Sequence, residues 1–71
     1  MQSMTHATNY HAVITSQGVD RVLKYHVALF FEGRQIATNS TDTRFGARRW
    51  ARRTARKHRR HQPYREEIAI G

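Results

Sequence analysis

The sequence predicts a small α+β domain: a three-stranded antiparallel meander, at about 10–16, 22–32 and 35–41, covered on one face by a C-terminal helix at about 43–61. Three observations lead to this prediction. Apolar and polar residues alternate in segments rich in β-branched residues, as is typical of half-buried strands. Glycine-containing turns separate these segments. A stripe of small and aromatic residues with helical spacing follows the last strand.

The chain has 71 residues, which is enough for one small domain. We expect this domain to span 9–61, because the polar segment 1–8 shows no periodicity and is typical of a disordered arm. The segment 62–71 has two interpretations. It is either an extra edge strand or a loose tail whose Glu66 and Glu67 lie against the basic helix.

The turns set the expected strand register. A four-residue loop at 18–21 is expected to join the first and second strands. A two-residue loop at Gly33 and Arg34 is expected to join the second and third strands. The expected cross-strand pairs are Ile14 with Tyr25, Ala12 with Val27, Phe31 with Ile36, and Leu29 with Thr38. Both registers place the same apolar set on one face: Tyr10, Ala12, Ile14, Tyr25, Val27, Leu29, Phe31 and Ile36.

The helix is expected to cover that apolar face. Asp42 or Thr43 can cap its N-terminus. The stripe that should face the sheet consists of Ala47, Trp50, Ala51, Thr54, Ala55 and His58. Its alanines allow close approach, Trp50 is expected to fill the core, and Phe45 is expected to close the near end. Pro63 prevents the helix from continuing much further.

Positive charge is concentrated on this helix. Residues 44–60 contain nine Lys or Arg and no acid, whereas the rest of the chain has four basic and five acidic residues. If the helix forms, six like-charged pairs stand four residues apart, and their repulsion is on the order of 1 to 3 kcal/mol. A polyanion would relieve this repulsion, although a merely solvated basic face is the alternative explanation.

The charge pattern therefore predicts a non-enzymatic, nucleic-acid-binding domain that holds phosphates. Arginine suits this role because its guanidinium is always charged and can bind phosphate in a bidentate manner. The predicted contacts on or next to the helix are Arg44, Arg48, Arg49, Arg52, Arg53, Arg56, Lys57, Arg59 and Arg60. Lys24 and Arg34 are predicted as further contacts from the sheet.

Thr43, Arg44, Ala47 and Trp50 spell T-[KR]-x-x-A-x-x-W after a three-stranded meander. This pattern resembles the arm-type DNA-binding domain of phage and transposon integrases, which has T-K-x-E-A-x-x-W at this junction, although Gly46 stands where that family has an acid. The resemblance covers about residues 10–58 and favours DNA over RNA as the ligand. It implies that the open sheet face enters the DNA major groove, and that face would be His11, Val13, Thr15, Lys24, His26, Ala28, Phe30, Ala37 and Asn39.

A second motif is similar to a different family. Arg48, Arg49, Ala51 and Arg52 give R-R-x-A-R, which resembles the K-K-x-A-K that opens the last helix of double-stranded-RNA-binding domains. This resemblance implies that the helix, and not the sheet, contacts phosphates across a groove. The first helix of that family has no counterpart here, since only nine residues precede the first strand.

The competing hypothesis is a protein-interaction module of a phage or mobile element that binds a host protein. An aromatic on the open face is expected at Phe30, where it could stack on a base or contact a partner or a second copy in a homodimer. His11 and His26 are expected to be cross-strand neighbours on the same face. Phage origin is inferred from the size, the integrase-like motif and the arginine bias.

Several classes are not expected. The chain has no glycine-rich phosphate loop and no nucleophile paired with a base, so we predict no enzymatic activity and no cofactor. Without cysteine there is no disulfide and no Cys-type zinc site, and His58 with His61 lacks a third ligand, so we predict no metal. The longest apolar run, at 27–31, is too short to span a bilayer, and no signal peptide is evident, so a cytoplasmic location is expected.

Overall fold

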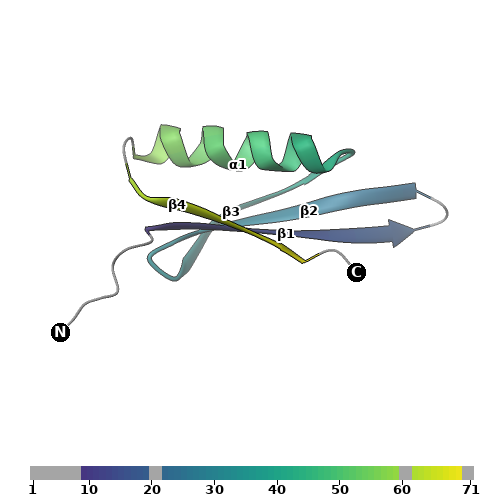
Figure 1. The fold of residues 1–71 in the computed structure, drawn as a ribbon, viewed down its shortest axis with the longest axis horizontal. Helices are drawn as coiled ribbons and strands as arrows, with labels where there is room; N and C mark the ends of the chain where they lie inside the picture. The colour runs from purple at the N-terminus through teal and green to yellow at the C-terminus, as the bar shows by residue number, and fades with distance from the viewer. Residues whose placement is uncertain (1–8, 20–21, 60–61, 70–71) are drawn as a thin grey trace.

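The computed structural model describes residues 9–19, 22–59 and 62–69. It shows a four-stranded sheet with one helix lying across one face (Figure 1). The elements are β1 (Tyr10–Val19), β2 (Val22–Phe31), β3 (Arg34–Thr41), α1 (Arg44–His58) and β4 (Tyr64–Ala69). The strand order is β3-β2-β1-β4. The α+β class and the meander covered by a helix are thus confirmed, and a fourth strand is added; the predicted arm at 1–8 lies outside the described residues.

The β1–β2 register differs from the prediction by two residues. Ile14 lies opposite Val27, and not opposite Tyr25, while Ala12 lies opposite Leu29. The strands continue to Val19 and resume at Val22, so the expected four-residue loop is wrong. Because side chains alternate with a period of two, a shift of two leaves every residue of these strands on its predicted face.

The β2–β3 turn is formed by Glu32 and Gly33, and Phe31 lies opposite Arg34. Both turn residues have positive φ, 51° and 83°, as a two-residue hairpin turn with the twist of the strands requires. Glycine adopts such an angle without steric cost. The turn predicted at Gly33 and Arg34 is therefore displaced by one residue.

A register shift between Leu29 and Phe30 changes which residues of β3 face the helix. Leu29 lies opposite Ala37, and Ala37 packs against the core together with its neighbour Ile36. Asn39 lies opposite the buried Val27, on the helix side of the sheet. The prediction that Ala37 and Asn39 lie on the open face is wrong, because an irregularity in a strand interrupts the alternation of its side chains.

The helix is capped by Thr43. The Thr43 Oγ1 accepts a hydrogen bond from the Gly46 N–H at 2.9 Å. A Cβ at Gly46 would lie 3.0 Å from that oxygen, so glycine leaves room for the cap. The helix ends at His58, earlier than expected, and Arg59 is already extended. A residue that precedes a proline disfavours helical geometry, so the helix could not run up to Pro63. Its end at His58 leaves enough chain to reach β4, which begins at Tyr64.

Of the two interpretations of the C-terminal segment, the structure has the edge strand. β4 runs parallel to β1 with Tyr64 opposite Tyr10, at the edge shown in yellow in Figure 1. The Tyr10 N–H donates to the Pro63 carbonyl at 2.9 Å and extends this pairing. The helix thus connects two edges of the sheet, from β3 to β4.

The core lies between the helix and the sheet. Its buried residues are Tyr10, Ala12, Ile14, Val27, Leu29, Ala47, Ala51 and Ala55, and the partly buried residues against it are Tyr25, Phe31, Ile36, Ala37, Trp50 and Tyr64. The predicted apolar face and alanine stripe are therefore present. The prediction for Phe45 is wrong, since its residue surface is 69% exposed. Position 45 lies about 200° around the helix from Ala47, which turns it away from the sheet.

Candidate nucleic-acid interface

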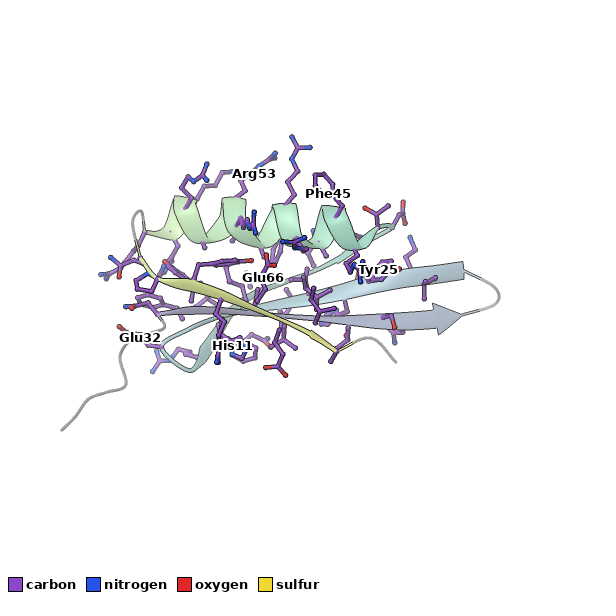
Figure 2. The ribbon with its side chains drawn as sticks, in the orientation of Figure 1. His11, Tyr25, Glu32, Phe45, Arg53 and Glu66 are labelled. Atoms are coloured by element: carbon purple, nitrogen blue, oxygen red, sulfur yellow. The ribbon has the colours of Figure 1, made fainter. Side chains whose placement is uncertain are left out.

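The side of α1 opposite the alanine stripe forms a basic surface. Because Ala47, Ala51 and Ala55 face the sheet, residues on the opposite side of the helical wheel project outward. A shallow hollow on this side is lined by Phe45, Arg48, Arg49, Arg52, Arg53 and Arg56, which we call the outer helix face. Figure 2 shows Phe45 and Arg53 extending from the helix away from the sheet.

Three arginines of the outer helix face have no acidic neighbour in the described part of the chain. Arg49, Arg53 and Arg56 are exposed, and none of them forms an ion pair with a described residue. The first turn of the helix contains no acid. These guanidinium groups are therefore available to an external anion without prior loss of an internal partner.

The other two arginines are held by a carboxylate from β4. The Arg48 Nε donates to Glu66 Oε1 at 2.8 Å, and the Arg52 Nε lies 3.3 Å from Glu66 Oε2. The Tyr64 hydroxyl donates to Glu66 Oε2 at 2.9 Å. The Glu66 side chain is only 12% exposed, whereas those of Arg48 and Arg52 are 41% and 55% exposed. Glu66 therefore orients both side chains while much of each guanidinium still faces solvent.

Of the two acids that the loose-tail interpretation placed against the helix, only one contacts it. Glu66 contacts α1, but Glu67 lies on the other side of the sheet, where its Oε1 is 3.0 Å from His11 Nε2. Neighbouring residues of a strand point to opposite faces, so both could not contact the helix. Once the segment is known to be a strand, the alternation of its side chains shows that Glu66 and Glu67 face opposite sides of the sheet.

The surroundings of Glu66 favour its charged form. Burial raises the pKa of this carboxyl, but the hydrogen bonds from Tyr64 and Arg48 and the charges of Arg48 and Arg52 together lower the pKa below its usual value. Burial, together with the bond to Glu66, raises the pKa of the Tyr64 hydroxyl. At neutral pH the tyrosine is therefore a donor and the glutamate an acceptor.

This arrangement predicts a loss of stability in acid. Because the pKa of Glu66 is lowered in the folded state, its stabilising contribution is present above the unfolded value of about 4.3 and is lost as the pH falls through the folded value. We expect Glu66→Gln to lower the free energy of unfolding by about 1.5 to 3 kcal/mol at pH 7, as for hydrogen bonds to a charged group.

Urea denaturation at pH 7 and pH 3 measures this effect. The difference between Glu66→Gln and the wild type should shrink at the lower pH, where the wild-type carboxyl also takes up a proton. Glu67→Gln is the matched control, because its side chain is 60% exposed and its loss should change stability little. Equal stability of the two variants at pH 7 would contradict a role for Glu66 in holding the helix.

The remaining predicted contacts on α1 lie at its ends. Arg44 begins the helix and Lys57 lies in its last turn, and both are exposed. Arg59 follows the helix, with its guanidinium carbon 5.4 Å from the centre of the Phe31 ring. Arg60 lies outside the described residues.

The predicted contacts from the sheet are separate from the outer helix face. The Lys24 Nζ donates to Asp42 Oδ1 at 2.7 Å, next to the start of the helix. This pair lowers the pKa of the exposed Asp42 carboxyl through the hydrogen bond and charge of Lys24. Arg34 is exposed at the start of β3, beside the Glu32–Gly33 turn.

The open sheet face contains a second shallow hollow. Its lining residues are Asn9, His11, Val13, Phe30, Gly33 and Arg65. Phe30 is half-buried and lies opposite His11, with the ring centres 6.3 Å apart. His26 lies opposite Thr15, so the expectation that His11 and His26 are cross-strand neighbours is wrong. The two-residue shift of β1 against β2 moves the two histidines apart.

Among the described residues, no three His, Asp or Glu side chains are grouped so as to hold a metal ion. The His58 Nδ1 instead shares a hydrogen bond with the Tyr10 hydroxyl, while His61 lies outside the described residues. No described helix is long and apolar enough to cross a membrane.

Comparison of the chain with protein-family models, with curated proteins and with solved structures found no significant match. Neither the integrase-like nor the double-stranded-RNA-binding-like motif is tested by this result, and both resemblances stay predictions. Charge and geometry therefore carry the functional proposal.

Proposed function

We propose that this protein is a non-enzymatic nucleic-acid-binding domain that holds phosphates on the outer helix face. The observation that supports this most directly is the set of exposed arginines, Arg49, Arg53 and Arg56, which have no acidic partner among the described residues. Arg48 and Arg52 lie beside them in orientations set by Glu66. Five guanidinium groups on one side of a rigid helix suit a row of phosphates.

Repulsion within the helix supports the same proposal. Arg49 with Arg53, and Arg53 with Lys57, stand four residues apart on the exposed side, where such like-charged pairs each cost about 0.2 to 0.5 kcal/mol. Glu66 offsets the charge only on the side of the helix that faces β4. A bound phosphate chain would neutralise the side that the described residues leave uncompensated.

Contacts of this kind position a nucleic acid without reading its sequence. Phosphate oxygens are the same at every nucleotide, so affinity is expected to depend on salt and only weakly on sequence. The integrase-like motif favours DNA over RNA, whereas the second motif resembles an RNA-binding family, and the experiment below compares the two ligands directly.

The test is the salt dependence of binding to a random-sequence duplex DNA, a duplex RNA and a single-stranded oligonucleotide of equal length. If about five phosphates of a duplex are neutralised, the logarithm of the affinity should fall with the logarithm of salt at a slope near −4.5. Polyaspartate of similar length is the control for attraction to any acidic chain. Binding weaker than roughly 10 μM to all three nucleic acids at low salt would refute the proposal.

A protein partner is the second candidate, and the hollow around Phe30 on the open sheet face is the observation that favours it. Such binding should depend on apolar contact and resist salt, in contrast to phosphate binding. Phe30→Ala should then abolish the interaction, whereas replacing arginines on the outer helix face should not.

A further inference from the structure

Phe45 is exposed in a surface otherwise made of arginines. It is 69% exposed, more than Leu23 at 51% or Ile68 at 42%, which both lie in the sheet. It lines the same hollow as the five arginines of the outer helix face, and no other apolar side chain of the described residues lines that hollow. Figure 2 shows its ring on the side of α1 away from the sheet.

Folding does not explain this position. The ring makes no contribution to the core, whose helical part is formed by the alanine stripe and Trp50. Phe45 lies in the first turn of the helix, directly after the Thr43 cap and Arg44, and its backbone is regularly helical. The positive end of the helix dipole lies at the same turn and adds to the attraction for phosphate.

We propose that the ligand of the outer helix face is single-stranded nucleic acid, with one base stacked on Phe45 and the following phosphates at Arg49, Arg52 and Arg53; this inference rests on the proposed function. In a duplex, base faces are covered by neighbouring base pairs, whereas a single strand can offer a face to an aromatic ring. The pairing of one aromatic with a row of cations matches a ligand that carries both flat apolar groups and regularly spaced negative charges.

Charge complementarity favours this ligand over an apolar protein segment. A segment seated on Phe45 would approach five guanidinium groups, which must keep water or meet anions, since unpaired charges are costly to bury. Arg49 and Arg53 follow Phe45 at successive turns, about 6 Å apart along the helix axis. A strand lying along the helix can therefore contact the ring and both arginines in turn.

An oligothymidylate and an abasic oligomer of the same length separate stacking from charge. Both have the same phosphates, but only the first has bases. We expect the wild type to bind oligothymidylate more tightly than the abasic oligomer by about 5-fold to 150-fold, the range for one base stacked on an aromatic side chain. Phe45→Ala should lower the affinity for oligothymidylate to that for the abasic oligomer, and Phe45→Trp should restore the difference.

Leu23→Ala is the matched control, because it removes another exposed apolar side chain and should leave both affinities unchanged. Circular dichroism should show that all variants keep the fold of the wild type. Equal binding of the two oligomers by the wild type, or an unchanged preference in Phe45→Ala, would overturn the stacking inference while leaving phosphate binding in place. If neither oligomer nor a duplex binds, both the inference and the proposed function fail.

Discussion

Replacing Arg49, Arg53 and Arg56 together by glutamine is expected to weaken nucleic-acid binding by on the order of 100-fold to 1,000-fold at 50 mM salt. These are the arginines of the outer helix face that form no ion pair with a described residue. Each lost phosphate contact should reduce the salt slope by about 0.9 for a duplex, so the slope should become shallower by about 2.7. Fluorescence anisotropy across a salt series measures both quantities.

The same triple variant should be at least as stable as the wild type. Its substitutions relieve like-charge repulsion between neighbouring turns, for example between Arg53 and Lys57, at about 0.2 to 0.5 kcal/mol per pair. Binding and stability are therefore expected to change in opposite directions. A loss of affinity could then not be attributed to unfolding.

A matched triple variant tests whether position or only net charge matters. Lys24 and Arg34, which the charge pattern predicted as contacts, contribute three positive charges together with Arg65. All three lie in β2, β3 and β4 and do not line the outer helix face to which we assign the binding. Their replacement by glutamine should change the affinity less than about 3-fold, since screened distant charges contribute little. Equal losses in the two triple variants would show that binding is not localised on the helix.

Leu29→Ala is expected to remove most of the stability of the fold. Leu29 is fully buried in the central strand β2, and truncation of a buried leucine costs about 2 to 5 kcal/mol. A domain this small is expected to have about 5 kcal/mol in total. The variant should therefore be partly or largely unfolded at 25 °C.

The reason for so large an effect is the composition of the core. The helix contributes three alanines to the buried cluster, and the largest fully buried side chains, Tyr10, Ile14, Leu29 and Val27, all come from β1 and β2. Burial of apolar surface is therefore concentrated in a few side chains of two strands. The residues opposite Leu29 are Ala12 and Ala37, which are too small to fill the space that its truncation leaves.

Urea denaturation followed by the fluorescence of Trp50 measures the change in the free energy of unfolding. Trp50 is the single tryptophan in the sequence, and it packs against the core. Leu23→Ala is the control, since the same substitution in the same strand removes a residue that is 51% exposed. It should change the free energy of unfolding by no more than about 0.5 kcal/mol. Similar midpoints for the two leucine variants would contradict the assignment of the core.

Part of the candidate site could be predicted from the pattern of residues near each other in the chain. The cluster of arginines on one helix follows from local spacing, because the alanines at 47, 51 and 55 identify the side that is buried. The role of Glu66 could not be predicted in this way. Its contact with Arg48 depends on β4 pairing with β1 across the sheet, which local periodicity does not report.

The position of Phe45 illustrates a different error. An aromatic residue near the start of a helix favours a place in the core, and the prediction followed that preference. Its angular distance from the alanine stripe was already contained in the sequence and indicates exposure. Helical geometry here outweighed the hydrophobicity of a single side chain.

Local residue patterns were enough to predict the α+β class, the apolar face of the meander, the alanine stripe and the concentration of positive charge on α1. These features depend on periods of 2 and 3.6 residues, which are properties of neighbouring residues. Three features became visible only in the folded molecule: the two-residue shift of β1 against β2, the irregularity in β3 that turns Asn39 toward the helix side, and the parallel pairing of β4. A shift by one full period leaves the pattern of faces unchanged, and pairing between distant strands is selected by packing of the whole molecule, so neither can be seen in local spacing.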